Sequence, residues 1–344
     1  MTMTNRPAEE INVSDATSQE FPDERSANSL KWILRTREFW ITIAVLAIGL
    51  GVSQITPHFA TYSNLSNVSQ NFCFIAILAL GMIPVLISGG IDISVGSLLG
   101  LCGVVLGLLL QANLPLWLGV GITLALGAGM GSINGVLIAY LRLPPFLVTL
   151  GMLSIARSLA IIVTNNQVIY SFGQAEKSIF WLGGGSTFGI SNVLYALIAC
   201  AIILQFLLTM TRWGRYVAAI GGNERAARLT GLAVKNIKVP VYAFSGLMAA
   251  VTSVFLVGWL GAVTNALGTG DELRVIAGAE IGGASLVGGY GWAFGAIIGS
   301  LLIEEIRNSL LLAGVNPFWQ GAFVGGFIIL AIILQKLQFR EEED

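Results

Sequence analysis

Long apolar runs, separated by short polar interruptions, occupy most of this chain. A helix of about 20 apolar residues crosses the hydrocarbon core of a bilayer. The runs have about that length, so the pattern predicts an all-α, polytopic membrane protein with about ten transmembrane helices. The predicted spans lie near residues 39–56, 66–88, 92–111, 116–141, 145–164, 192–211, 239–260, 273–290, 292–313 and 318–336.

Composition supports this class. Hydrophobic residues make up 55% of the chain and charged residues 11%, whereas a soluble domain carries about 25% charged residues. The net charge of −1 gives no reason to expect a nucleic-acid partner. Cys73, Cys102 and Cys200 lie inside apolar runs without the spacing of metal ligands, and His58 is the only histidine. We therefore expect no metal site, no catalytic residues and no enzymatic activity.

The distribution of cations orients the predicted spans, because cytoplasmic segments of membrane proteins carry an excess of Lys and Arg. With the N-terminus in the cytoplasm, 14 of the 18 Lys and Arg residues fall in cytoplasmic segments. Ten spans with both termini inside therefore fit best. Residues 1–30 are polar and acidic, which predicts a disordered cytoplasmic tail. Residues 31–338 form the transmembrane domain, and residues 339–344 form an acidic C-terminal tail.

One predicted cytoplasmic loop, residues 212–238, is strongly basic. It holds six Lys and Arg residues: Arg212, Arg215, Arg225, Arg228, Lys235 and Lys238. Asn223 is a suitable helix N-cap, Glu224 favours the first helical turn, and Gly231 is a natural stop. We therefore expect a two-turn helix over residues 223–230, lying on the cytoplasmic surface.

Such a short, polar helix suits contact with a cytosolic partner, and the alternative is an ordinary interfacial loop. The two glycines before it permit a sharp bend of the chain. The predicted contact residues are Gly221, Gly222, Asn223, Glu224, Arg225, Ala226, Ala227, Arg228 and Gly231.

Two glycine-rich breaks, residues 88–97 and 282–291, interrupt the apolar pattern and hint at an internal repeat. Unwound helices of repeated halves often lie at the substrate site of transporters. In the first break, Asp92 lies at a membrane boundary, where a carboxylate is costly unless it is solvated or paired. It either hydrogen-bonds a passing polyol or fixes the Gly-Gly turn, and we favour the second. The other pathway candidates in this break are Gly89, Gly90, Ser94 and Ser97.

Other glycines recur at four-residue spacing within predicted spans. Gly127, Gly131 and Gly135 form one such series. Small residues at this spacing let two helix backbones approach closely, so we expect these glycines to pack against a neighbouring helix.

Three segments resemble the ribose-type family of ABC sugar-import permeases. GRYVAAIGGNERAARLTGLAV is similar to the coupling segment of that family, and ISGGIDISVGS and DELRVIAGAEIGGASLVGG are similar to two further signatures, in the family's order. The resemblance extends over residues 39–335, and residues 88–115 resemble the autoinducer-2 branch. It implies a multi-pass permease of the bacterial inner membrane. The implied partners are a second permease copy or a paralogue, cytosolic ABC ATPase subunits, a periplasmic sugar-binding protein and membrane lipid.

A separate observation agrees with this resemblance. The chain contains no phosphate-binding loop and no Gly-Lys pair at all. If transport is driven by ATP, the nucleotide is bound by a separate subunit and this chain needs no cofactor. The basic loop is then the expected contact with that subunit.

Several charged residues lie within or beside predicted spans, where a charge costs a few kcal/mol or more. Asp271 and Glu272 are expected near an outer membrane end. Glu304 and Arg307, three residues apart on one helix face, are expected to pair. Ribose-type permeases carry apolar or small neutral residues in this region, so the charges depart from the resemblance. We expect Glu280, Glu304, Glu305 and Arg307 to line a wet pathway or a permease–permease interface, and the alternative is an internal structural ion pair.

Taken together, these features favour the permease subunit of an ATP-driven importer for a small sugar or polyol, working by alternating access. The rival is an ion-coupled secondary transporter that uses Glu280, Glu304 and Glu305 as proton or cation sites. A membrane-embedded enzyme would need a clustered nucleophile and base or a set of metal ligands, and the scattered cysteines and the one histidine do not supply them.

Overall fold

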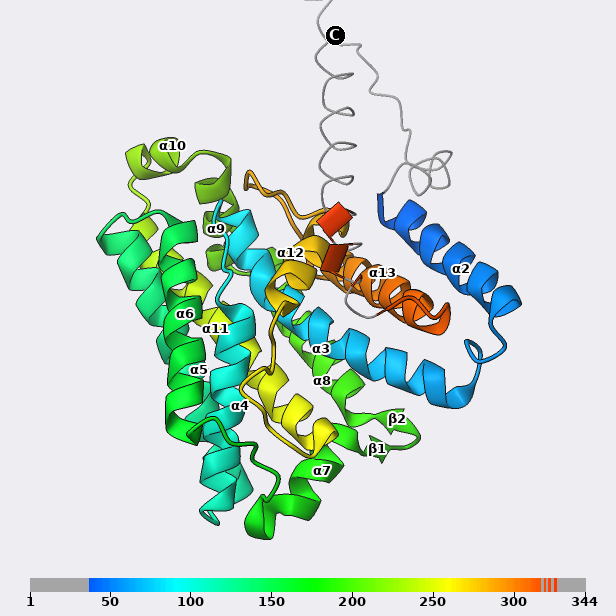
Figure 1. The fold of residues 1–344 in the computed structure, drawn as a ribbon. Coiled ribbons are helices and arrows are strands. Elements are labelled where there is room, and N and C mark those ends of the chain that lie inside the picture. Colours follow the sequence, from blue (N-terminus) through cyan, green and yellow to red (C-terminus); the bar gives the residue numbers. More distant parts are fainter. Residues whose placement is uncertain (1–36, 317–318, 320, 323–324, 327–344) are drawn as a thin grey trace, which may run out of the picture.

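The computed structural model describes residues 37–316, 319, 321–322 and 325–326, so the predicted span 318–336 and both predicted tails lie largely or wholly outside the described residues. The described chain is almost entirely helical, which confirms the all-α class (Figure 1). The main helices are α2 (Arg37–Ile55), α3 (Tyr62–Ile87), α4 (Val95–Gln111), α5 (Leu116–Tyr140), α6 (Pro145–Thr164), α8 (Asn192–Met210), α11 (Val234–Leu260) and α13 (Ala293–Leu312). The shorter elements are η2 (Gly173–Ala175), α7 (Glu176–Gly184), α9 (Arg212–Gly222), α10 (Glu224–Leu229), α12 (Asp271–Ile281) and the antiparallel pair β1 (Ser186–Thr187) and β2 (Ile190–Ser191).

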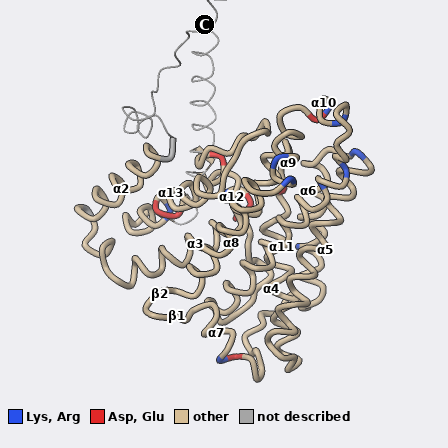
Figure 2. The backbone as a smooth tube through the Cα atoms, turned by 180° about the vertical axis from the view of Figure 1, so that it is seen from behind, with Lys and Arg blue, Asp and Glu red and all other residues tan. Residues whose placement is uncertain are grey.

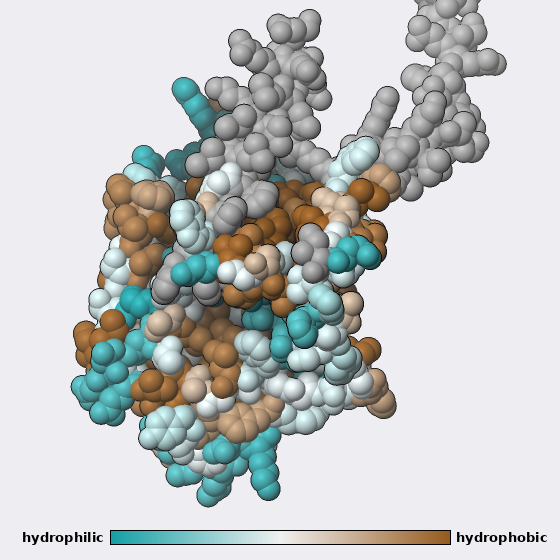
Figure 3. Space-filling view, turned by 45° about the vertical axis from the view of Figure 1, so that its right-hand side comes forward, coloured by the Kyte–Doolittle hydropathy of each residue, from teal (hydrophilic) through white to brown (hydrophobic). Residues whose placement is uncertain are grey.

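Five helices of the described chain, α3, α5, α6, α8 and α11, are long and apolar enough to cross a membrane. Shorter apolar stretches, Phe39–Gln54 and Val95–Gln111, lie in α2 and α4. Large apolar side chains are exposed on the outer surface, among them Ile202 and Phe206 of α8, and apolar residues cover much of the face seen in Figure 3. The protein is therefore an integral membrane protein, while the count of ten spans stays a prediction.

The bundle has two distinct ends. At one end, called here the α10 end, lie α9 and α10, the last turn of α3 and the first turn of α11 (Figure 1). At the other, called the α7 end, α7 packs against the last turns of α11 and β1 and β2 lie beside it. Figure 2 shows the described Lys and Arg positions gathered mainly at the α10 end, whereas α7 carries Lys177.

The predicted span 273–290 is wrong in its limits, because the helix there, α12, has 11 residues and ends at Ile281. At about 1.5 Å per residue, α12 is roughly 16 Å long and cannot cross a bilayer by itself. The chain leaves α11 at the α7 end and returns to the α10 end by residue 289, where Gly289 bonds Ile87. Residues 261–281 therefore make the crossing, partly as an irregular, turn-rich segment and partly as α12. Gly268 and Gly270, with φ of 72° and 83°, keep the first part out of a helix.

A row of glycines on α4 receives this turn-rich segment, residues 261–270. A Cβ on Gly96 would lie 2.2 Å from the Gly268 carbonyl oxygen, and a Cβ on Gly100 would lie 2.7 Å from the Leu267 carbonyl oxygen. Non-helical backbone inside a membrane must find its hydrogen-bond partners within the protein. Arg157 of α6 supplies them, because its Nη1 donates to the carbonyl oxygens of Asn265 at 2.6 Å and Leu267 at 2.8 Å.

The most extensive helix packing joins α5 to α11, and we call it the α5–α11 seam. A Cβ on Gly131 would lie 2.2 Å from the Tyr242 carbonyl oxygen, and one on Gly127 would lie 2.4 Å from the Gly246 carbonyl oxygen. A Cβ on Gly135 would lie 2.7 Å from the Cα of Val239. The prediction that this glycine series permits close packing is confirmed.

Candidate coupling and pathway sites

The basic loop folds as two consecutive helices, α9 and α10. Asn223 lies between them with an extended backbone, and its side-chain oxygen accepts a hydrogen bond from the Ala226 N–H at 2.9 Å. Thr230 and Gly231 end α10, and Gly231 adopts φ 85°. The predicted helix, its cap and its stop are confirmed. The turn of the chain lies at Asn223, and the Gly-Gly pair before it forms the last two residues of α9.

Ion pairs fasten α10 to the first turn of α11. The Glu224 carboxylate accepts hydrogen bonds from Arg228, one turn along α10, and from Lys238 of α11, whose Nζ lies at 2.7 Å. Partial burial raises the pKa of Glu224, but the hydrogen bonds and charges of Lys238 and Arg228 outweigh it and hold the pKa below its usual value. Glu224 is therefore ionised at neutral pH and keeps α10 in place.

The outer face of α10 combines positive charge with an apolar side chain. Arg225 and Arg228 are exposed, Ala227 turns inward, and Leu229 is 84% exposed. Sequence analysis missed Leu229, because a leucine in a helical pattern is usually assigned to the buried face. An exposed leucine flanked by arginines is a surface suited to binding another protein.

Three glycine-containing segments, far apart in the sequence, meet directly below α9. The Gly289 N–H donates to the Ile87 carbonyl oxygen at 2.8 Å. A Cβ on Gly221 would lie 1.6 Å from that same oxygen, and a Cβ on Gly288 would lie 2.8 Å from the Gly221 carbonyl oxygen. The last turn of α3, the second glycine-rich break and the end of α9 thus form one backbone-to-backbone contact, which we call the glycine junction.

Asp92 is completely buried and its carboxylate is fully used within the chain. One oxygen accepts from the Ser94 backbone N–H at 3.0 Å and from the Ser94 hydroxyl at 2.6 Å, and the other accepts from the Ser245 hydroxyl at 2.8 Å. Asn134 of α5 donates to the Ser94 hydroxyl oxygen at 3.1 Å. This geometry fits a structural role for Asp92. The element that the carboxylate fixes is the start of α4. The carboxylate does not hold the Gly89 and Gly90 amides, which bond carbonyl oxygens of α3.

The other pathway candidates in the first glycine-rich break have different surroundings. Ser97 is buried and donates to the Ser94 carbonyl oxygen at 2.8 Å. Gly89 adopts φ 75°, which favours glycine, and Gly90 leaves room for the Tyr242 hydroxyl, 2.2 Å from where a Cβ would lie. These glycines therefore shape the break, and neither serine is exposed in this conformation.

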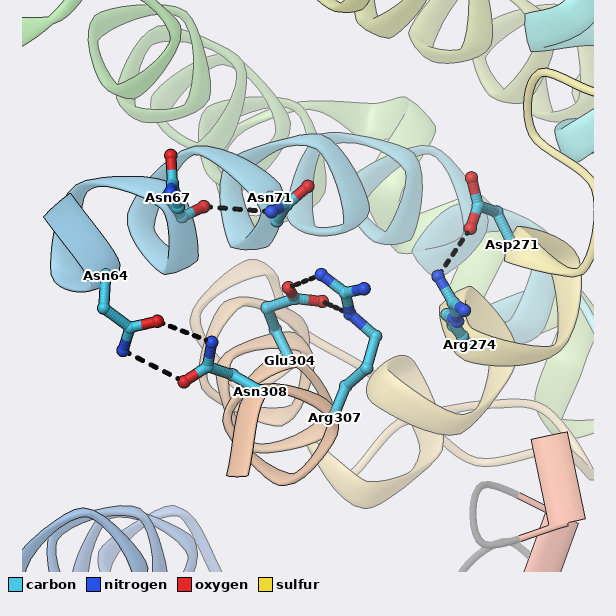
Figure 4. Close-up of polar contacts among 8 residues, drawn as sticks. All are labelled: Asn64, Asn67, Asn71, Asp271, Arg274, Glu304, Arg307 and Asn308. Carbon is cyan, nitrogen blue, oxygen red and sulfur yellow. Dashed lines mark hydrogen bonds and ion pairs between the residues drawn. The ribbon is translucent and has the colours of Figure 1, made fainter. Parts of the chain in front are cut away.

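The predicted set of Glu280, Glu304, Glu305 and Arg307 does not form one site. Glu304 is 1% exposed and pairs with Arg307, whose Nε donates to it at 2.9 Å, so the predicted pair is confirmed (Figure 4). Glu305 lies against α2, where its Oε1 would be 2.6 Å from a Cβ on Gly49. Glu280 is buried on α12.

Asp271 and Glu272 do not lie at an outer end as expected. Asp271 pairs with Arg274 at 3.2 Å, and Glu272 lies beside the first turn of α4, 2.4 Å from where a Cβ on Gly96 would be. The physical reason is the turn-rich segment before them. Residues 261–270 run along α4, where the Leu267 and Gly268 carbonyl oxygens lie against Gly100 and Gly96, and they carry the start of α12 deep into the protein.

A helical membrane bundle with a broken crossing and an exposed basic helix at one end has the features of a transport permease. Comparison with known proteins identifies the family. The chain belongs to the family described as branched-chain amino acid transport system / permease component, whose model matches residues 64–332. Members are permease components and not enzymes, which confirms the expected lack of enzymatic activity.

Individual relatives cover nearly the whole chain. The ribose import permease protein RbsC of Escherichia coli K12 is 34% identical over 306 residues, covering 89% of this chain and 94% of the relative. The galactose/methyl galactoside import permease protein MglC of Salmonella typhimurium is 34% identical and covers 91% and 97%. The autoinducer 2 import system permease protein LsrC of Photorhabdus luminescens is 32% identical and covers 89% and 91%. No solved structure matches the chain.

Proposed function

We propose that this chain is the membrane-spanning permease of an ATP-binding-cassette importer that moves a small sugar or polyol across the bacterial inner membrane. The named relatives import ribose, galactose, methyl galactoside and autoinducer 2, whereas the family description refers to branched-chain amino acids. Support for a sugar therefore comes from the similarity to these relatives over almost the full length. Transport follows alternating access, with little substrate affinity in the permease itself.

We assign a different partner protein to each end of the bundle. A cytosolic ATPase subunit binds the outer face of α10, so the α10 end and both termini face the cytoplasm, in agreement with the cation distribution. A periplasmic sugar-binding protein docks at the α7 end. A hollow of about 590 Å³ lies there, between the α4–α5 connection and α7, with Trp117 and Trp181 in its lining. A second permease copy or a paralogue completes the transporter, and ATP is bound by the separate subunit.

The glycine junction is the observation that carries this proposal. An external helix can drive transport only if its displacement reaches the parts of the permease that open and close. At Gly221 the end of α9 touches the end of α3 and the second glycine-rich break without intervening side chains. A displacement of α10 is therefore transmitted to both breaks through direct backbone contacts, with no side chain between them to absorb it.

Adjacent glycines provide a matched test of this junction. Gly221→Ala places a methyl group 1.6 Å from the Ile87 carbonyl oxygen, whereas nothing lies within 4 Å of a Cβ on Gly222. Overpacking of this kind costs about 1–3 kcal/mol, which corresponds to roughly a tenfold or larger loss. In proteoliposomes with the ATPase and binding protein, we expect Gly221→Ala to lower ATP-driven uptake about tenfold or more and Gly222→Ala to transport normally. Equal uptake by the two variants would contradict the proposal.

A second test addresses the contact with the ATPase. Arg225→Glu reverses an exposed charge on α10 without touching the junction, so we expect uptake to be lost while the permease still inserts. ATP hydrolysis should continue but no longer respond to the sugar-loaded binding protein. Asn223→Ala should weaken coupling less, because it removes one cap hydrogen bond worth about 1 kcal/mol. Coupled hydrolysis by Arg225→Glu would show that the ATPase binds elsewhere.

The ion-coupled alternative is not favoured. Its proposed proton site at Glu304 is already paired with Arg307 inside the protein. Uptake that survives ATP depletion and collapses when an uncoupler is added would support the alternative.

A further inference from the structure

One face of the first half of α3 is lined by amides. Asn64, Asn67 and Asn71 recur at spacings of three and four residues, which places them on one side of the helix. Most of the residues from 62 to 71 are Ser, Asn or Gln, although α3 as a whole is long and apolar enough to cross a membrane. Asn67 is exposed, and Asn64 and Asn71 are partly exposed.

Polar side chains of α13 and α12 continue this line, as Figure 4 shows. Asn64 and Asn308 form a reciprocal amide pair, with N···O distances of 3.1 and 2.8 Å. Further along α3, the Asn71 side chain donates to the Asn67 carbonyl oxygen at 3.1 Å. The Glu304–Arg307 pair follows on α13, and the Asp271–Arg274 pair lies at the far end of the line (Figure 4). We call these eight residues, Asn64, Asn67, Asn71, Asp271, Arg274, Glu304, Arg307 and Asn308, the polar row.

The polar row is electrically neutral. Its two carboxylates and two guanidinium groups form two ion pairs, and its other members are uncharged amides. Asp271 also lies within electrostatic range of Arg307, so the two pairs act on one another. A neutral row neither attracts nor repels an ion by net charge, but it offers many hydrogen bonds to an uncharged molecule.

The polar row has N–H donors that its own ion pairs do not use, and its side chains are partly exposed to a bound molecule. A guanidinium group carries five N–H donors, and Arg307 uses two of them on Glu304. The side chains of Arg307 and Arg274 are 19% and 27% exposed, whereas Glu304 beneath them is 2% exposed. Polar groups at membrane depth face the bundle interior or a water-filled cavity, because lipid cannot satisfy them.

The row also ends at the place where the bundle is broken. Asp271 and Arg274 belong to α12, which begins where the turn-rich segment 261–270 stops. Discontinuous crossings of this kind lie at the substrate pathway of many transporters. The row therefore leads from the start of α3, away from the glycine junction, to the broken crossing.

We propose that the polar row is the part of the translocation pathway that hydrogen-bonds an uncharged, polyhydroxylated substrate as it crosses. This inference rests on the proposed function and adds a location and a selection rule to it. Amides and paired guanidinium groups exchange hydrogen bonds with hydroxyl groups as the substrate passes. The balanced charges keep each site weak, so the substrate is not retained.

Cysteine accessibility tests the location. In a background with Cys73, Cys102 and Cys200 replaced by Ala, Asn67→Cys and Asn71→Cys should react with a membrane-impermeant cationic methanethiosulfonate, even in the lipid-embedded protein. Ile202→Cys, at a 65% exposed apolar position of α8, serves as the lipid-facing control and should not react. Failure of Asn71→Cys to react, or equal reaction of the control, would overturn the proposal. So would a disulfide-linked permease dimer formed through Asn71→Cys, since it would place the row between two copies.

Transport kinetics test the selection rule. Asn67→Ala and Asn71→Ala each remove hydrogen bonds to the substrate, so the maximal rate of sugar uptake should fall about threefold to tenfold. The thermal stability of both variants should stay close to that of the unmodified protein, which separates a loss of substrate contact from a folding defect. Ser66→Ala, on the opposite face of α3, is the matched control and should transport normally. Uptake unchanged by both asparagine variants would show that the row does not contact the substrate.

These outcomes are separate from a failure of the proposed function. If the unmodified protein transports without ATP, the importer proposal is wrong, whatever the labelling pattern. If uptake requires ATP and the binding protein but Asn71→Cys stays unlabelled, the importer proposal stands and the polar row is not the pathway.

Discussion

The α5–α11 seam and the polar row along α3 both join helices of one membrane bundle, but they do so in opposite ways. In the seam, backbone meets backbone, and a Cβ on Gly246 would lie 2.1 Å from the Gly127 carbonyl oxygen. In the polar row, helices are joined by side-chain pairs such as Asn64–Asn308 and Glu304–Arg307. The seam is buried and consists of backbone atoms, which cannot rotate out of the contact. The row is partly exposed and consists of side chains, which can rotate out of it.

This difference suggests a division of labour. Contacts through backbone atoms have one arrangement, because any displacement separates or overlaps main-chain groups. Side-chain hydrogen bonds can be exchanged for bonds to water or to a substrate at small net cost. We therefore expect α5 and α11 to move as one body during transport, and the row on α3, α12 and α13 to be the surface that changes its partners.

The largest effect is expected in the seam. Gly131→Val would place side-chain atoms on the Tyr242 carbonyl oxygen and should abolish the yield of folded protein, because the backbone of α11 cannot shift to make room. Gly129→Val on the same helix is the control, since nothing lies within 4 Å of a Cβ there. Fluorescence-detected size-exclusion chromatography in detergent compares the two. Similar yields would show that the seam is not rigid.

A smaller but still large effect is expected where the polar row is most buried. Arg307→Gln leaves the Glu304 carboxylate, which is 2% exposed, without its cation. Breaking a buried pair in this way costs about 3–5 kcal/mol. Removing both charges with Glu304→Gln and Arg307→Gln together should restore most of the lost thermal stability. A double variant as unstable as Arg307→Gln alone would mean that the pair itself, and not an uncompensated charge, holds α13.

The smallest effect is expected at the exposed start of the row. Asn64→Ala removes the reciprocal amide pair with Asn308, which should cost about 1–2 kcal/mol of stability because two modest hydrogen bonds are lost. A double-mutant cycle with Asn308→Ala, read from melting temperatures, measures the coupling energy. If Asn64→Ala destabilised the protein as strongly as Gly131→Val, the contrast between the seam and the row would not hold.

Local features were well predicted from the sequence. The helix over 224–229, its Asn223 cap and its stop near Gly231 follow from contacts within a few residues, which local residue types determine. The pair of Glu304 and Arg307 is likewise set by helical spacing. Most predicted spans match helices for the same reason, since an apolar run of sufficient length has few other options in a membrane.

The errors lie where distant segments meet. The span 273–290 was misplaced because glycine-rich apolar residues suit turns as well as a helix, and the α4 glycines that accept the turn-rich segment before α12 are far away in the sequence. Arg157 had no assigned role for the same reason: its partners are carbonyl oxygens of Asn265 and Leu267, and any residue type carries such an oxygen.

By itself, the sequence determined that this is a helical membrane protein, which end carries its cations and where a short capped helix stands out from the bundle. These properties depend on burial of apolar side chains and on hydrogen bonds between near neighbours. Only the tertiary structure decided that Gly221 meets the end of α3 and the second glycine-rich break, that residues 261–281 cross as a broken element, and that amides of α3 align with the charges of α12 and α13. These are contacts of backbone atoms and of side chains remote in the chain, and no local pattern records them.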